Sequence, residues 1–217
     1  MNTNWAFVSD FDGTISLQDF YWMVIEKYYP EGRELYRDWK AGRMKDIDFL
    51  STVFSSINQD EQTIIDDIYN MEIDKYVPAF IQEVQASGGD FYILSAGSDY
   101  YIRHMLEKHG IKNVEVYANR GFYEKRNVRM ITDDSDWHYH ERYGIDKSKV
   151  VRKLKEKYDR VYFAGDSEPD SHPATEADIT FAKDVLQTIL SERNVPYIPA
   201  GSFEDIRHYL QNEGMLK

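Results

Sequence analysis

Three short apolar runs stand out along the chain, and each ends in a group of small, polar or acidic residues. They are Trp5–Val8, Phe91–Leu94 and Val161–Ala164. A run of this length bounded by turn-forming residues is typical of a strand that is buried on both faces. Segments with helical spacing of apolar residues separate the runs. This alternation predicts an α/β protein with a mostly parallel sheet covered on both faces by helices.

The second half of the chain continues this alternation. From about Pro78 onward, the pattern predicts helices over residues 79–86, 99–109, 146–158 and 203–211, and further short strands over residues 114–117 and 178–182. Gly110 follows the second of these helices and is typical of a helix end. Together with the first run, these elements make up the expected core domain, residues 1–15 and 77–217.

Residues 16–76 show a different pattern, without a strand signal. Apolar residues recur at helical spacing in several groups, among them those around Phe20 and Ile64, and we predict three or four helices. Asp46 and Asp60 are candidate N-caps for two of them. These helices could belong to the layers that cover the sheet, but their number favours a separate helical module inserted into the core.

Residues 119–145 give the least regular pattern. A hairpin is expected over residues 119–131. After it, His138, His140 and Glu141 lie close together in the sequence, and two histidines with a glutamate could bind zinc. The alternation of aromatic residues and histidines also fits an ordinary strand, which is the interpretation we favour.

Composition narrows the range of functions. The 217 residues include 26 lysines and arginines against 38 aspartates and glutamates, a net charge of −12. This acidity argues against a nucleic-acid partner, because phosphate backbones need a positive surface, although a phosphorylated small molecule can bind at a local cationic site. No apolar stretch approaches about 18 residues, so no membrane span is expected. Cysteine is absent and no secretory leader is recognised, so we expect a cytoplasmic protein.

The first apolar run is followed at once by Asp10, Asp12 and Gly13. In an open α/β sheet, ligands bind at the carboxyl ends of the strands. Two carboxylates at one such end repel each other unless a cation or a proton lies between them, and Mg²⁺ is the simplest occupant. Gly13 permits a tight turn there. Acidic turns without a function are common, so the other motifs have to show whether these two aspartates belong to a functional site.

Three further motifs follow in order. The second run ends in Ser95–Gly97, a lysine-rich helix starts at Lys147, and the third run leads into Asp166 and Asp170. The order strand–DxDGT, strand–Ser, helix–Lys and strand–GDxxxD resembles that of the haloacid dehalogenase superfamily of phosphohydrolases. The resemblance implies a Rossmann-like core, and it implies that residues 16–76 form a C1-type helical cap that closes over the active site.

The same resemblance implies a Mg²⁺-dependent hydrolysis of a phosphomonoester. Asp10 would attack the phosphorus atom and carry the phosphoryl group as an aspartyl-phosphate. Asp12 would protonate the leaving oxygen and then act as the base for the attacking water. The metal would be bound by the side chain of Asp10, the backbone carbonyl of Asp12 and the side chain of Asp166, with Asp170 as a ligand or as the holder of a metal-bound water.

The remaining motif residues would hold the phosphoryl group. Ser95 would donate to a phosphoryl oxygen, helped by the backbone N–H groups of Ala96 and Gly97, and it is also a candidate helix N-cap. Lys147 would neutralise the charge of the nucleophile and the phosphoryl group, with a solvated surface lysine as the alternative interpretation. Two other lysines of the same helix are further candidates: Lys149 and Lys153.

Within the superfamily, the chain resembles the phosphoserine phosphatase-like branch, and within that branch the methionine-salvage enzymes that act on 2-hydroxy-3-keto-5-methylthiopentenyl-1-phosphate. The DFDGTI start, Asp19, SAGSDY and GDSEPD carry this resemblance, which spans nearly the whole chain. It departs at residues 133–145, where those enzymes have a cysteine-rich segment and this chain has none. Asp19 is a candidate for substrate binding.

Phosphoserine phosphatases usually have glutamate at the position of Asp19, together with a cap arginine that holds the amino acid. Three arginines are available in the predicted cap: Arg33, Arg37 and Arg43. Of these, Arg43 is our candidate for a second substrate-binding residue.

Three functions are compatible with these motifs. The first is a phosphatase whose partner is a small phosphorylated metabolite, either the enol-phosphate above or another compound such as phosphoserine. The second is transfer of the phosphoryl group to a sugar at the same site. The third is a non-catalytic phosphoryl-binding protein, but a binding protein has no need of an acid two residues after a nucleophile. We therefore favour the first.

Overall fold

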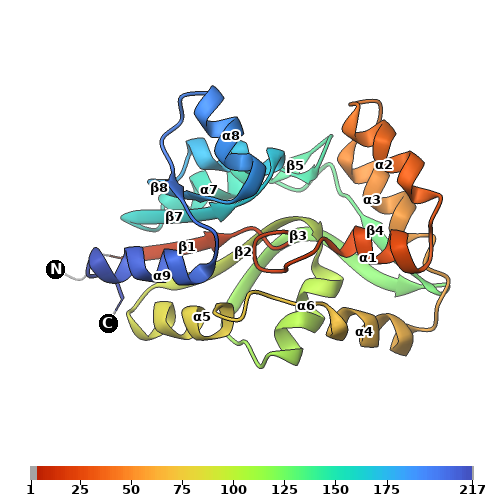
Figure 1. Ribbon diagram of the computed structural model, residues 1–217, viewed down its shortest axis with the longest axis horizontal. Coiled ribbons are helices and arrows are strands. Elements are labelled where there is room, and N and C mark those ends of the chain that lie inside the picture. The colour runs from red at the N-terminus through yellow and green to blue at the C-terminus, as the bar shows by residue number, and fades with distance from the viewer. Residues whose placement is uncertain (1–3, 217) are drawn as a thin grey trace.

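The computed structural model describes residues 4–216, so residues 1–3 and 217 of the predicted core lie outside the described part. A seven-stranded sheet in the order β4-β3-β2-β1-β7-β8-β9 forms its centre (Figure 1). The strands are β1 (Trp5–Ser9), β2 (Asp90–Ser98), β3 (Val114–Glu124), β4 (Asn127–Ile131), β7 (Arg160–Gly165), β8 (Ile179–Ala182) and β9 (Ile198–Pro199). Neighbouring strands are parallel except β3 and β4. The predicted mostly parallel sheet is confirmed.

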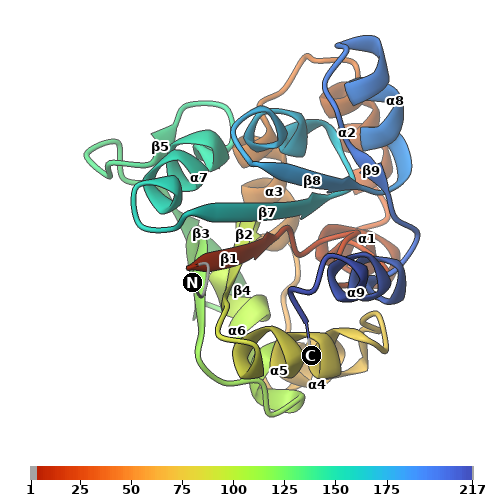
Figure 2. The same ribbon diagram turned by 90° about the vertical axis from the view of Figure 1, so that its left-hand side faces the viewer.

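Strand β1 shows why both faces of the sheet are buried. Successive side chains of a strand point to opposite faces. Trp5 and Phe7 belong to the apolar cluster that includes α5 (Val77–Ala86) and α9 (Phe203–Asn212), whereas Ala6 and Val8 belong to the cluster that includes α7 (Lys147–Lys155) and α8 (Asp184–Glu192). Figure 2 shows the two helical layers on either side of the strands.

Four helices lie between β1 and α5. They are α1 (Phe20–Lys27), α2 (Gly32–Lys40), α3 (Asp46–Phe54) and α4 (Glu61–Asn70), as the sequence predicted. Asp60 caps α4, because its carboxylate accepts the N–H of Thr63 at 3.0 Å. The N-cap prediction for Asp46 is wrong: α3 begins one residue early, with Lys45 at the cap position, and the Asp46 carboxylate faces Arg142 at 2.8 Å instead.

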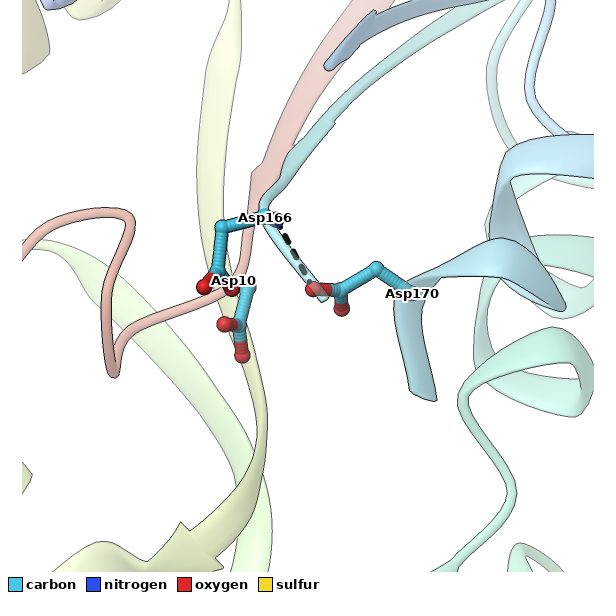
Figure 3. A group of neighbouring side chains, drawn as sticks. All are labelled: Asp10, Asp166 and Asp170. Carbon is cyan, nitrogen blue, oxygen red and sulfur yellow. Dashed lines mark hydrogen bonds between the residues drawn. The ribbon is translucent and has the colours of Figure 1, made fainter. Parts of the chain in front are cut away.

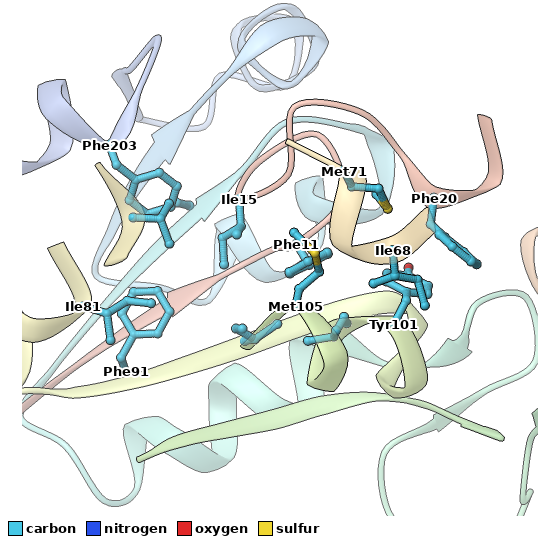
Figure 4. Close-up of a cluster of buried hydrophobic side chains, with 14 of the residues drawn as sticks. Phe11, Ile15, Phe20, Ile68, Met71, Ile81, Phe91, Tyr101, Met105 and Phe203 are labelled. Atoms are coloured by element: carbon cyan, nitrogen blue, oxygen red, sulfur yellow. The ribbon is translucent and has the colours of Figure 1, made fainter. Parts of the chain in front are cut away.

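Three of these helices share the buried core of the sheet. Side chains of α1, α3 and α4 join the same apolar cluster as α5 and α9. Phe20 stacks on Tyr101 of α6 (Asp99–Lys108) with ring centroids 4.5 Å apart, and Phe11 lies 5.8 Å from Tyr101 (Figure 4). The helices are therefore anchored at the carboxyl end of the sheet, and the division into a core and a cap made of residues 16–76 stays a prediction.

The structure differs from the predicted elements in several places, among them the short strand β9, which was not predicted. Strand β2 continues to Ser98, with a shift in its pairing with β3 after Leu94. The predicted short strand over 114–117 and the first arm of the predicted hairpin are one strand, β3, because its second half extends past β2 and pairs with β4. Helix α8 was not predicted, since Leu186 and Leu190 are its only buried residues.

A small two-stranded sheet, β5 (Tyr139–His140) and β6 (Gly144–Ile145), precedes α7. It confirms the strand interpretation of this segment. The zinc interpretation is not supported, because His140 Nδ1 accepts the N–H of Arg142 at 3.0 Å and Glu141 pairs with Lys45 at 2.5 Å. Within residues 4–216, no helix has the length and apolarity needed to cross a bilayer.

Candidate active site

Two acidic residues leave neighbouring strands at the same edge of the sheet, and a third joins them. Asp10 follows β1 and donates its N–H to Ala164 of β7 at 2.9 Å, while Asp166 follows β7 directly. Asp170 lies in a short 3₁₀ turn, Glu168–Ser171. Each of the three carboxylates has an oxygen within 4.8 Å of the others (Figure 3). The parallel pairing of β1 and β7 thus brings together residues that are far apart in the sequence.

Backbone N–H groups hold the third carboxylate in place. Asp170 Oδ2 accepts the N–H of Asp166 at 3.0 Å, the dashed line in Figure 3, and the N–H of Ser167 at 3.2 Å. Its side chain is fully buried. The Gly-Asp-Ser-x-x-Asp motif is therefore a turn that folds its last carboxylate back onto its own start.

Burial and mutual repulsion make this cluster a site for a cation. Burial, and then the charge of Asp170, raise the pKa of Asp10 well above its usual value. The same two causes, in the same order, raise the pKa of Asp166 to about 8. Three carboxylates this close together are stabilised as anions by a hard divalent cation, and oxygen ligands suit Mg²⁺. The residues present fit the metal that the sequence predicted.

One lysine neutralises part of this charge. Lys147, the first residue of α7, donates from Nζ to Asp10 Oδ1 at 2.6 Å and to Asp170 Oδ1 at 2.7 Å. Burial acts to lower the pKa of this ammonium, but the two carboxylates outweigh it and the pKa is raised. The other candidate lysines lie elsewhere: Lys149 is exposed with Nζ near the carbonyl of Tyr139, and the Lys153 ammonium lies over the Trp137 ring.

The carboxyl group of Asp12 has hydrogen-bond partners of its own. Oδ1 accepts the N–H of Phe20 at 3.1 Å, and Oδ2 accepts from the Tyr101 hydroxyl at 2.5 Å and from the Ser95 hydroxyl at 3.3 Å. Burial, and then the negative charge of Asp19, raise the pKa of Asp12 to about 6, against the lowering effect of these hydrogen bonds. A carboxyl group with this pKa can give up and take back a proton near neutral pH.

Two glycines allow these groups to come this close. Gly13 has φ 77°, and a Cβ there would lie 2.4 Å from Asp166 Oδ2. A Cβ on Gly97 would lie 1.7 Å from the Tyr101 hydroxyl oxygen and 2.8 Å from Asp12 Oδ2. Any side chain at either position would displace a carboxylate of the site.

The sequence predicted Ser95 at the end of the second strand, but in the structure it lies inside β2, three residues before the strand ends at Ser98. Its hydroxyl, which donates to Asp12, also accepts the N–H of Gly97 at 2.9 Å. The alternative interpretation of Ser95 as a helix cap is wrong, because β2 continues for three residues and Ser98 is the residue that accepts the N–H of Tyr100. Ser95 is thus left to face the acidic residues.

The neighbouring Ala96 lines a cavity of about 230 Å³. This cavity adjoins Lys147 and extends under the β5–β6 segment, where His140, Tyr143 and His172 also line it. The Ala96 carbonyl accepts from the side-chain amide of Asn119 at 2.8 Å. Asn119 therefore fixes the last part of β2 beside this cavity.

The two candidate substrate residues differ in position. Asp19 precedes α1 and is close enough to Asp12 for its charge to act on that carboxyl group. Burial raises the pKa of Asp19, and a hydrogen bond from Tyr21 acts in the opposite direction. Arg43 instead pairs with Asp38 at 2.5 Å and its side chain is 64% exposed. The structure brings Asp19 to the site and leaves Arg43 outside it.

Sequence reasoning missed Tyr101, whose hydroxyl contacts Asp12. Tyr101 is the third residue of α6, the helix that begins directly after β2. The first turn of a helix that follows a strand end faces that end, and a tyrosine there was the available signal.

Comparison with known proteins decides the family. The haloacid dehalogenase-like hydrolase family matches residues 7–172, which contain all four motifs. The chain belongs to this family. The predicted Rossmann-like core and the predicted enzyme class, a phosphoric monoester hydrolase of the haloacid dehalogenase type, are confirmed.

Relatives of this hydrolase cover almost its whole length. It is 30% identical over 207 residues to the 2-hydroxy-3-keto-5-methylthiopentenyl-1-phosphate phosphatase of Bacillus cereus (strain ATCC 10987 / NRS 248), with 94% of each chain covered. The phosphatase of the same name from Bacillus cytotoxicus is 27% identical, again with 94% of each chain covered. Among solved structures, a substrate-bound phosphoserine phosphatase matches with a TM-score of 0.70 and 16% identity, covering 96% of this hydrolase and 99% of that chain.

Proposed function

We propose that the protein hydrolyses a small phosphomonoester in two steps through an aspartyl-phosphate on Asp10. The observation that carries this proposal is the different surroundings of two carboxyl groups on one turn. Asp10 contacts Lys147 and lies within the acidic cluster, whereas Asp12 lies apart from it with a pKa of about 6. The first arrangement suits a nucleophile and the second suits an acid–base group.

In the first step, an Asp10 oxygen forms a bond to phosphorus while the bond from phosphorus to the ester oxygen breaks. Asp12 gives its proton to that leaving oxygen, so the alcohol departs neutral. Lys147 stays paired with Asp10 and Asp170 and offsets the negative charge that gathers there. Ser95 and the N–H groups of Ala96 and Gly97 would donate to the phosphoryl oxygens.

In the second step, water attacks the phosphorus of the aspartyl-phosphate. Asp12, now a carboxylate, takes the water proton, and the bond between phosphorus and the Asp10 oxygen breaks to release inorganic phosphate. We propose that Asp10, Asp166, Asp170 and the backbone carbonyl of Asp12 hold a Mg²⁺ ion. When bound, this ion would neutralise phosphoryl charge and orient the phosphoryl group.

For the substrate, we propose 2-hydroxy-3-keto-5-methylthiopentenyl-1-phosphate, the compound in the name of relatives that match 94% of the chain. The partner class, a small phosphorylated metabolite, follows from the same similarity. Phosphoserine is the second candidate, because a phosphoserine phosphatase shares the fold. The position of Arg43, paired with Asp38 outside the site, favours the first candidate.

The test is phosphate release from a panel of phosphomonoesters, with Mg²⁺ and with EDTA. The panel contains phosphoserine, p-nitrophenyl phosphate and the enol-phosphate made in situ. We expect release that requires Mg²⁺ and a preference for the enol-phosphate, and we expect Asp10→Asn to abolish turnover with the fold preserved. A preference for phosphoserine would refute the proposed substrate and indicate a phosphoserine phosphatase instead. Turnover retained by Asp10→Asn would refute the assignment of the nucleophile.

A further inference from the structure

The last turn of α2 carries a cation that is held over two aromatic rings. The Lys40 ammonium lies 4.1 Å from the centroid of the Trp39 ring and 5.5 Å from that of Tyr36. Nearby Arg43 pairs with Asp38, but Lys40 forms no ion pair within the described chain, residues 4–216. Lys40 therefore presents a free positive charge, held in place by aromatic faces, in a protein of net charge −12.

A short series of contacts connects this cation to the candidate active site. Tyr21 of α1 directly follows Phe20, whose N–H donates to Asp12 Oδ1 at 3.1 Å. The Tyr21 ring centroid lies 6.2 Å from that of Tyr36 and 5.6 Å from that of Trp39. The charge of Lys40 also acts on Asp19, whose pKa it helps to lower against burial. Lys40 and its two rings thus lie on the Asp19 side of the site.

That side is where the leaving group of a substrate must extend. The ester oxygen has to lie within hydrogen-bonding distance of Asp12, the group that protonates it. Asp12 is closed off on other sides by Phe20, Tyr101 and Ser95, and the charge of Asp19 acts on it. The atoms beyond the ester oxygen therefore extend past Asp19 toward the end of α2.

We propose that Lys40 is a specificity-determining residue that binds carbonyl or hydroxyl oxygens of the leaving group, while the Trp39 and Tyr36 rings cover its apolar part. An ammonium donates well to such oxygens, and a thioether makes favourable contacts with aromatic rings. The preferred substrate class is a phosphomonoester with oxygen substituents close to the ester and an apolar or thioether tail. This inference rests on the proposed phosphatase function and deepens it.

The test uses two stable probes that differ only in these oxygens: dihydroxyacetone phosphate and n-propyl phosphate. Their dissociation constants are measured by calorimetry with Mg²⁺ in the Asp10→Asn protein, with and without Lys40→Met, a change that keeps the apolar stem over the rings. We expect Lys40→Met to weaken dihydroxyacetone phosphate binding about 10- to 100-fold. Binding of n-propyl phosphate should change less than about twofold, since it offers no oxygen beyond the ester.

A control variant separates this role from the general charge of the helix. Arg37→Met removes an exposed cation of the same helix and should leave both dissociation constants unchanged. Equal weakening of both probes by Lys40→Met, or an effect of Arg37→Met as large, would overturn the proposal. In the catalytically intact protein, Lys40→Met should raise KM for the enol-phosphate with little change in kcat. Because the binding comparison needs no turnover, it decides the role of Lys40 even if hydrolysis is absent.

Discussion

At the scale of single residues, Asp10 and Asp12 show how one turn can hold two carboxyl groups of different character. Asp10 is paired with Lys147 inside the acidic cluster, and Asp12 accepts hydrogen bonds from Phe20, Tyr101 and Ser95. Burial raises the pKa of both carboxyl groups, but the charge that acts next is that of Asp170 on Asp10 and that of Asp19 on Asp12. The division of roles is therefore a property of the surroundings and not of the residue type.

The role of Asp12 can be tested through the leaving group. Asp12→Asn removes the proton donor, so kcat for an alkyl phosphate should fall by about 10²–10⁴-fold. The rate of the first step should fall much less for p-nitrophenyl phosphate, whose leaving oxygen departs without a proton. Burst kinetics with both substrates measure this step separately from the release of phosphate. If the rate of the first step fell by the same factor for both substrates, the assignment of Asp12 as general acid would be contradicted.

The close approach at Gly13 gives a second prediction. Gly13→Ala adds a Cβ at φ 77° that would lie 2.4 Å from Asp166 Oδ2, so we expect a loss of about 1–3 kcal/mol in stability and weaker Mg²⁺ binding. Gly42→Ala is the matched control, because Gly42 has φ 74° with nothing within 4 Å of the added Cβ. Urea unfolding and Mg²⁺ titration check both variants. Weakened Mg²⁺ binding in Gly42→Ala as well would show that backbone strain, and not contact with Asp166, is the cause.

At the scale of elements, the start of α3 is fastened to the segment between β5 and β6. The Ile47 N–H donates to the carbonyl of Arg142 at 3.0 Å. Two ion pairs flank this bond, Arg142 with Asp46 at 2.8 Å and Lys45 with Glu141 at 2.5 Å. They connect the predicted cap with the segment that lines the cavity beside Lys147. The position of α3 thus depends on a segment with little regular structure.

The two ion pairs should differ in strength, because their burial differs. The Asp46 side chain is 8% exposed, so Arg142→Ala leaves a buried carboxylate without its partner, at a cost of about 1–3 kcal/mol. Glu141 is 75% exposed, so Glu141→Ala should change the stability little, because solvent screens an exposed ion pair. Thermal unfolding of both variants measures the difference. A loss in Glu141→Ala equal to that in Arg142→Ala would mean that burial of Asp46 does not matter.

At the scale of the whole molecule, part of the negative charge of the chain gathers at the candidate active site. The chain carries a net charge of −12, and three of its carboxylates converge at one edge of the sheet with a single buried lysine between two of them. The fold therefore keeps like charges close together, and the stability of the protein should depend on whether protons or a cation offset them.

This dependence has a definite sign. The pKa of Asp12 is raised to about 6 and that of Asp166 to about 8. Above their ordinary pKa the unfolded chain has lost protons that the folded chain still binds, so stability falls as the pH rises toward 8. His172, whose pKa is raised by a hydrogen bond to Glu168, acts in the same direction above its ordinary value of 6.5.

We therefore expect the Tm in EDTA to be lower at pH 8 than at pH 6. Mg²⁺ should raise the Tm more at pH 8, because fewer of its carboxylate ligands then carry a proton that the ion has to displace. Asp166→Asn should reduce the pH dependence, and His172→Gln measures the share due to the histidine. Scanning calorimetry at both pH values, with Mg²⁺ and with EDTA, checks this. An unchanged Tm in EDTA between the two pH values would contradict the raised pKa values.

Most of the fold follows from local patterns. Apolar runs predicted β1, β2 and β7, and helical spacing predicted the helices of residues 16–76. Helix α8 was not predicted, because its two buried leucines, Leu186 and Leu190, make too short a pattern. The full length of β3 was not predicted, because it depends on pairing with β4. Such pairing is a contact between strands and cannot be read from residues 114–124 alone.

The sequence by itself determined the order of the motifs and hence the family, because each motif is a short run of consecutive residues next to a strand or at the start of a helix. Only the tertiary structure decided which side chains meet there. In the structure, Lys147 and not its neighbouring lysines contacts Asp10. The Tyr101 hydroxyl donates to Asp12, and Arg43 pairs with Asp38 outside the site. The physical reason is that a turn is encoded locally, whereas the direction of a side chain on a helix depends on how that helix packs against distant elements.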